Sequence, residues 1–79
     1  LKRLKEIEDI GFTFKGVKKC YAIQAGKELR VIVDSVQIND EQASKMAFDI
    51  ATSIEQKMKY PGQIKVTVIR ETRAIGYAK

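Results

Sequence analysis

Any chemistry in this chain would depend on ten carboxylates, one thiol and fifteen basic side chains, because the sequence contains no histidine. The absence of histidine excludes Ser–His and Cys–His catalysis, imidazole acid–base chemistry and histidine-rich metal sites within these residues. The carboxylates are few, and most lie beside lysines. We therefore predict that these 79 residues contain no catalytic residue, no metal ligand and no cofactor site, and that they are not an enzyme by themselves.

The single thiol belongs to Cys20, which cannot form an internal disulfide. A chain with one cysteine suits a reducing cytosol. With no histidine to activate it, Cys20 is better explained as a small buried strand residue than as a nucleophile. No apolar run approaches the ~18 residues that cross a bilayer, and no signal-peptide pattern opens the chain, so we expect a cytoplasmic domain without direct membrane contact.

Basic side chains exceed acidic ones by five. Such a surplus can hold a polyanion, but ordinary cytosolic domains often carry one of similar size. The charge alone therefore leaves RNA binding open without favouring it. The length allows one domain with one helix-on-sheet core, and 44% apolar with 32% charged residues is typical of a folded soluble protein.

The first half of the chain predicts a helix followed by a hairpin. The helix covers about residues 1–13, where Gly11 either ends it as a C-cap or weakens it by ~1 kcal/mol. The hairpin strands are 17–24 and 29–34, and the turn between them contains Gly26, which adopts positive φ without strain. The opening segment contains no methionine and reads as the middle of a helix, so we expect its N-terminal end to be truncated.

The second helix has the clearest signals. Asn39 and Gln42 have the spacing of a capping box, and Asp40 and Glu41 suit the positive end of a helix. The turn at Pro61 should follow its end. One apolar stripe at helical spacing faces the expected core, formed by Ala43, Met46, Ala47, Ile50, Ala51, Ile54 and Met58.

A third strand, 63–70, completes the pattern of helix, strand, strand, helix, strand. A right-handed crossover through the second helix makes this strand parallel to strand 29–34. We place strand 17–24 between the other two, antiparallel to both. The predicted fold class is α+β, in the order α-β-β-α-β, with a three-stranded mixed sheet and two helices packed on one face.

The uncovered face of the sheet is the main candidate site. It should collect cations and apolar groups, with the strand register deciding whether Tyr21 or Cys20 joins them: Lys19, Arg30, Ile32, Lys65, Thr67 and Ile69. Such a face can hold single-stranded RNA through phosphate contacts and stacking. Only Tyr21 is a plausible stacking ring, however, so docking of another protein surface, with Ile32 and Ile69 in the interface, or a solvated face explains the pattern as well.

Three further residues lie outside that face or at its end. Phe48 is on the side of the second helix opposite the stripe, where it is either a scattered exposed aromatic or a contact for another domain or subunit. Arg70 and Arg73 flank Glu71. These two arginines are further candidates for RNA contact, although a local ion pair with Glu71 explains them better.

Two long stretches carry a resemblance to a known family. "CYAIQAGKELRVIV" (Cys20–Val33) and "YPGQIKVTVIRETRAIGYAK" (Tyr60–Lys79), together with the intervening "QASKMAFDIATSIEQKM", resemble the extreme C-terminus of bacterial ribonuclease Y. The resemblance covers essentially all 79 residues in long ungapped agreement. Phe48 and Gly11 depart from the pattern.

The resemblance implies a larger enzyme. Ribonuclease Y proteins are membrane-anchored bacterial endoribonucleases that begin mRNA decay, with a transmembrane helix, a coiled coil, a KH domain and a metal-dependent HD phosphodiesterase domain before the terminal region. The family's catalytic and metal-binding positions do not map onto this chain. The resemblance thus implies that residues 1–79 are a C-terminal accessory domain facing the cytoplasm, whose parent uses a divalent metal in its HD domain.

The expected role is structural: packing on the parent's own HD domain, or pairing two protomers as a homodimer. A weak single-stranded RNA-binding module is one alternative, with Lys19, Arg30, Lys65, Arg70 and Arg73 steering RNA toward the HD site. Docking of another RNA-decay protein is a second. The sequence leaves all three open.

Overall fold

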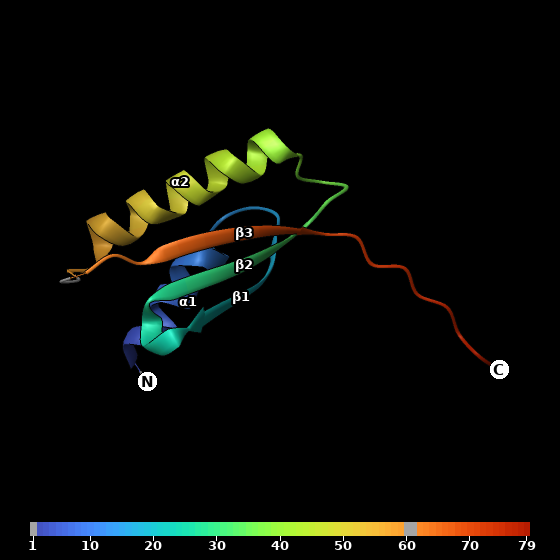
Figure 1. Cartoon of the computed structure of the whole chain (residues 1–79), viewed down its shortest axis with the longest axis horizontal. Helices are drawn as coiled ribbons and strands as arrows, with labels where there is room; N and C mark the ends of the chain where they lie inside the picture. Colours follow the sequence, from blue (N-terminus) through green and yellow to red (C-terminus); the bar gives the residue numbers. More distant parts are fainter. Residues whose placement is uncertain (1, 60–61) are drawn as a thin grey trace.

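The structure, a computed structural model, describes residues 2–59 and 62–79. The chain forms α1 (Lys2–Phe12), β1 (Val17–Ile23), a short 3-10 turn (Gln24–Gly26), β2 (Glu28–Asp34), α2 (Asp40–Lys57) and β3 (Lys65–Glu71). This order confirms the predicted α-β-β-α-β pattern. Both helices pack on one face of a three-stranded mixed sheet, so the fold class is α+β (Figure 1).

The order of the strands differs from the expected one. β2 is the central strand, antiparallel to β1 on one side and parallel to β3 on the other. The parallel pairing of β2 and β3 was predicted correctly, but the placement of β1 between them was wrong. Physically, β2 carries the fully buried Leu29, Val31 and Val33, whereas β1 carries Lys18 and Lys19, which suit an exposed edge strand.

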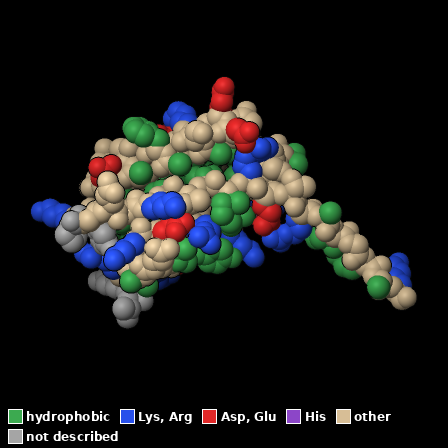
Figure 2. All heavy atoms as spheres, in the orientation of Figure 1, with side chains coloured by type: hydrophobic (Ala, Val, Ile, Leu, Met, Phe, Trp, Pro, Cys, Tyr) green, Lys and Arg blue, Asp and Glu red, His purple; other side chains and the backbone are tan. Residues whose placement is uncertain are grey.

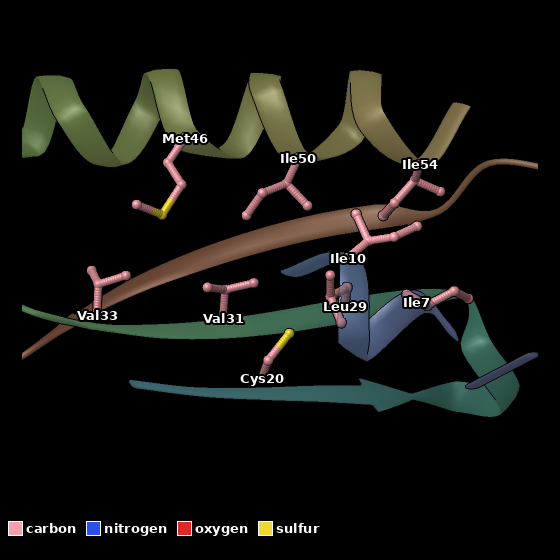
Figure 3. Packing of buried hydrophobic residues seen from close by; sticks show 9 residues of the cluster. All are labelled: Ile7, Ile10, Cys20, Leu29, Val31, Val33, Met46, Ile50 and Ile54. Atoms are coloured by element: carbon pink, nitrogen blue, oxygen red, sulfur yellow. The ribbon is translucent and has the colours of Figure 1, made fainter. Parts of the chain in front are cut away.

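The core lies between the sheet and the two helices. Met46, Ile50 and Ile54 project from α2 toward the β2 side chains, and α1 and β1 close the cluster with Ile7, Ile10 and Cys20 (Figure 3). Leu29, Val31, Val33, Ile7 and Ile50 are the largest side chains that are fully buried. The predicted stripe of α2 is thus confirmed as its core face.

The start of α2 is built as the sequence predicts. The Asn39 Oδ1 atom accepts a hydrogen bond from the Gln42 N–H at 2.8 Å, and the Gln42 Oε1 atom accepts one from the Asn39 N–H at 2.8 Å. This reciprocal capping box satisfies two amides that have no partner inside the helix. α2 ends at Lys57, and the predicted turn at Pro61 lies outside the described residues.

Gly11 has a role that the sequence did not indicate, whereas the positive φ predicted for Gly26 is confirmed. Gly11 lies inside α1 and is buried where the helix crosses β1, and an added Cβ would overlap the Sγ atom of Cys20. Close helix–strand approach, not helix termination, therefore explains Gly11. In the hairpin turn, Gln24 and Ala25 adopt positive φ together with Gly26, so the left-handed segment begins two residues before the glycine.

Candidate interaction surfaces

The open face of the sheet is made of cross-strand rows of side chains. The pairing puts Tyr21 beside Arg30 and Thr67, and Lys19 beside Ile32 and Ile69. Cys20 pairs with Val31 on the covered side, so the register brings Tyr21, not Cys20, onto the open face. We call this surface the open face, and the row that begins at Lys19 contains the two predicted interface residues Ile32 and Ile69.

A third row contains a carboxylate that the sequence reading missed. Glu28 lies opposite Lys65, and only 5% of the residue is exposed. Its Oε2 atom accepts a hydrogen bond from Thr67 Oγ1 at 3.0 Å and forms an ion pair with Arg30 Nη2 at 3.4 Å. Glu28 and Arg30 are two residues apart in β2, so their side chains lie on the same face of the sheet. This spacing could have placed Glu28 on the open face from the sequence alone.

The far end of the open face also carries negative charge. Asp34 pairs with Lys18 at 3.4 Å and lies opposite Glu71. The backbone N–H of Val36 and the Lys18 ammonium hold the pKa of Asp34 below its ordinary value. The open face therefore combines cations with carboxylates instead of presenting one sign of charge.

Arg70 lies on the helix side of β3, away from the open face. Its guanidinium donates hydrogen bonds to the carbonyl oxygens of Ile38 at 2.7 Å and Ser35 at 2.9 Å, and pairs with Asp40 Oδ1 at 2.7 Å. These contacts fasten the loop between β2 and α2 to the end of β3. Planar bidentate donors are well suited to this arrangement.

The five cations predicted as RNA contacts do not form one cluster. Lys19, Arg30 and Lys65 share the open face, whereas Arg70 holds the loop described above. Arg73 forms the predicted ion pair with Glu71 at 2.7 Å, but the same local pairing predicted for Arg70 was wrong, because Arg70 pairs with Asp40. RNA contact by the five residues stays a prediction.

Phe48 lies on the outward side of α2, with 71% of its surface exposed. The open face is on the other side of the sheet, and 37% of Ile69 is exposed there. The predicted interface residues thus belong to two separate surfaces, one on each layer of the fold. An interface role for Phe48, Ile32 and Ile69 stays a prediction.

Cys20 is a core residue. Burial, with a smaller contribution from the Glu8 carboxylate, raises the pKa of its thiol to about 11. A thiol in this state is protonated at neutral pH and is a poor nucleophile. In the described part of the chain, no group of three acidic, histidine or cysteine side chains is arranged to hold a metal ion. None of the helices over residues 2–59 and 62–79 is long and apolar enough to cross a membrane.

Comparison with known proteins identifies relatives of this chain by sequence. Ribonuclease Y of Borrelia garinii subsp. bavariensis is 61% identical over all 79 residues, that of Syntrophobacter fumaroxidans is 58% identical, and that of Fusobacterium nucleatum is 51% identical. No family model and no solved structure matches the chain. The chain is therefore homologous, over its whole length, to the C-terminal region of bacterial ribonuclease Y, as the resemblance predicted.

The match covers a small part of each relative. The 79 residues span 16% of the Borrelia garinii and Fusobacterium nucleatum proteins and 15% of the Syntrophobacter fumaroxidans protein. The relatives are named as bacterial ribonucleases, hydrolases that cleave RNA.

Proposed function

We propose that this domain is a non-catalytic interaction module of a ribonuclease Y-type endoribonuclease, and that its open face docks against the rest of that enzyme. The proposal depends on one observation, the mixed charge of the open face. Arg30 is paired with the buried Glu28, and Asp34 adds a second carboxylate. A site that tracks phosphates presents cations without interleaved carboxylates, whereas mixed charge around exposed apolar groups is typical of protein docking.

The rest of the enzyme is the favoured partner because it is covalently attached in the relatives. The domain spans only 16% of the first of them, so the remaining chain is held at high effective concentration beside it. Under this proposal, the parent's metal-dependent HD domain supplies the catalysis, and its N-terminal helix supplies the membrane anchor. The domain itself contributes packing on the cytoplasmic side.

Side-chain accessibility tests the docking surface directly. Ile69→Cys places a reactive thiol on the open face, and Val36→Cys places one on a loop where 89% of the residue is exposed. Native Cys20 does not compete, because its thiol is buried and protonated. Alkylation of both variants is measured at micromolar concentration in the 79-residue chain and in a complete ribonuclease Y that contains this domain.

Docking predicts that the Ile69→Cys thiol reacts fast in the isolated domain and much more slowly in the complete enzyme. The Val36→Cys thiol should react equally fast in both. Phe48→Cys, measured in parallel, reports on the α2 surface. Equal reaction rates of the Ile69→Cys thiol in both proteins would refute docking through the open face.

RNA binding is the second candidate, favoured by the charge surplus of five and by Lys19 and Lys65 on the open face. Another RNA-decay protein could occupy the same surface. Nuclease activity is not expected: the 79-residue chain with Mn²⁺ or Mg²⁺ should leave single-stranded RNA intact. Cleavage by a clean preparation, lost on addition of a chelator, would overturn the non-catalytic role.

A further inference from the structure

The chain leaves the body of the fold after β3 as an extended arm, residues 72–79 (Figure 1). Ile75 is 69% exposed and Tyr77 is 84% exposed. Figure 2 shows hydrophobic side chains along the projecting arm. A strand-like segment with two large apolar side chains in solvent gains little from folding by itself. Their exposure leaves both side chains accessible to a second surface.

The arm alternates large and small residues. The small residues Ala74, Gly76 and Ala78 alternate with Ile75 and Tyr77. The backbone conformation of Gly76 does not require a glycine. Among the described residues, the glycines with positive φ are Gly16 and Gly26. A Cβ added to Gly76 would meet no atom within 4 Å. Nothing in a single copy of the chain therefore requires small side chains on this side of the arm.

The β3 strand has a free hydrogen-bonding edge. The Lys65 N–H donates to the Lys27 carbonyl at 2.8 Å, so odd-numbered residues of β3 bond to β2 and the backbone groups of Val66, Val68 and Arg70 point outward. The opposite edge of the sheet is partly covered, since the Ala22 N–H donates to Glu8 of α1 at 2.9 Å. An open strand edge is a template for an added strand.

A shallow groove runs beside the free edge of β3. It has a volume of about 410 Å³ and lies between the first half of α2 and the end of β3. The helix contributes three small side chains to it, Ala43, Ser44 and Ala47, while Val68 forms the strand side, and the Asp40–Arg70 ion pair closes one end. A strand added at this edge would have to present small side chains toward α2.

We infer that the arm of one copy pairs antiparallel with the β3 edge of a second copy, reciprocally, so that two domains share one continuous sheet. Because β3 and the arm form one extended segment, the residues whose backbone groups point outward are even-numbered in both. Val66, Val68 and Arg70 of one copy must therefore pair with even-numbered arm residues of the other. Directly opposite residues share a face, so Ala74, Gly76 and Ala78 lie on the α2 side. Ile75 and Tyr77 lie on the open face. This inference rests on the proposed interaction role and names a second copy of the chain as one partner.

Charge selects one register among those with the correct parity. Placing Arg73 opposite Glu71 of the other copy, an ion pair that forms twice by symmetry, aligns Ile75 with Ile69, Gly76 with Val68 and Tyr77 with Thr67. The like-charge pair in this register, Lys79 opposite Lys65, is exposed at the end of the arm. A shift of two residues in one direction places Glu71 opposite Glu71, and the other shift places Arg73 opposite Arg73. Like charges directly opposite are destabilising, whereas opposite charges and apolar pairs are favourable.

Folding of the arm back onto its own β3 edge is disfavoured by the sequence after β3. A tight hairpin at residues 71–74 would use Glu, Thr, Arg and Ala, which lack the Gly, Asn or Asp that such turns require. Pairing with a second copy needs no turn, since β3 and the arm remain one extended segment. A two-fold arrangement is also closed and forms no fibre.

The test is the self-association of the 79-residue chain, measured by analytical ultracentrifugation up to about 1 mM, a range in which even a small interface populates a dimer. The native chain should form a concentration-dependent dimer. Tyr77→Asp should weaken it about a hundredfold or more, because each substitution acts twice in a two-fold dimer. Val36→Asp is the matched control, which adds the same charge at an exposed apolar residue of the body and should leave the dimer unchanged.

Gly76→Phe separates arm exchange from non-specific association of apolar side chains. In the single chain the site is open, so the variant should fold normally. In the paired sheet its ring would face the small residues of α2, so dimerisation should be lost, whereas non-specific association would be strengthened. Amide exchange locates the contact: the Val66, Val68 and Arg70 amides should become protected as concentration rises.

A native chain that remains monomeric to about 1 mM would overturn the arm-exchange inference. So would a dimer that survives Gly76→Phe or one that leaves the three edge amides unprotected. None of these outcomes affects the alkylation test of Ile69→Cys, which is made at micromolar concentration and reports on docking to the rest of the enzyme.

Discussion

The two faces of the sheet differ in how far packing within the domain determines their side chains. On the covered face, Leu29, Val31 and Val33 have no exposed surface, and packing against the helices determines each side chain. On the open face, the same strand carries Glu28, Arg30 and Ile32; Glu28 is held by Thr67 and Arg30, whereas Arg30 and Ile32 lie outside the helix-packed core. Conformational stability is therefore concentrated on one face. The other face is the one to which we assign the proposed docking role.

The largest expected effect lies on the covered face. Ile50→Ala removes a fully buried side chain from the centre of α2 and should lower the free energy of unfolding by about 3 kcal/mol. Ile69→Ala on the open face should lower it by less than about 1 kcal/mol, because the side chain is partly exposed. Urea denaturation measures both, and equal losses would contradict the division between the faces.

Gly11→Ala is expected to cost about 1–3 kcal/mol, although alanine is the better helix former. Its new methyl group would overlap Cys20 Sγ, so the helix must move away from β1. The same substitution in a Cys20→Ala background should be neutral or stabilising. Thermal unfolding of the two single variants and the double variant forms the cycle, and a purely additive result would show that the close approach is unimportant.

Arg70→Met should cost about 1–2 kcal/mol by releasing the loop before α2. The two carbonyl oxygens and the Asp40 carboxylate would lose their shared donor. Arg73→Met is the matched control, because Arg73 pairs only locally with Glu71, and its loss should change stability by less than about 0.5 kcal/mol. Similar losses for both variants would contradict the assigned role of Arg70.

The buried thiol predicts a loss of stability at alkaline pH. Cys20 has its pKa raised from 9.0 to about 11 in the folded state, so the unfolded chain releases this proton first as the pH rises. The contribution of the protonated thiol is complete below pH 9 and is lost between about pH 9 and pH 11. Cys20→Ala should lack this component of the pH profile; an unchanged profile would show that Cys20 is not its source.

The smallest effect on stability is expected at the outer side of α2. Phe48→Asp should change the free energy of unfolding by less than about 0.5 kcal/mol, because the ring is mostly exposed. Denaturation of the isolated domain checks this value. A loss of more than about 1 kcal/mol would mean that Phe48 supports the fold itself and is not available to a partner.

Local signals made much of the fold predictable. The capping box of Asn39 and Gln42 and the stripe of α2 depend on residues close in sequence, and both were found from spacing alone. The central position of β2 depends on which strand edges are covered, which no short pattern records. The close approach at Gly11 likewise arises between elements that meet only after folding.

The sequence predicted which cations and apolar residues share the open face, but it did not predict the carboxylate among them. Alternation placed Arg30, Ile32, Lys65 and Ile69 on one face, but Glu28 was not counted with them. Arg70 shares the alternation of β3 with the core residue Val68, and its pairing with Asp40 joins residues far apart in sequence. Such long-range contacts explain why the five cations looked like one group in the sequence and are divided in the structure.

The most direct test of the central claim, that this domain acts by protein contact and not by holding RNA, is a titration of the isotope-labelled chain with single-stranded RNA. Spectra are compared at low salt, about 20 mM, and at about 200 mM. We predict no saturable, salt-dependent shifts at the Lys19, Arg30 and Lys65 amides. Saturable shifts at these three positions that weaken steeply as salt rises would contradict the account.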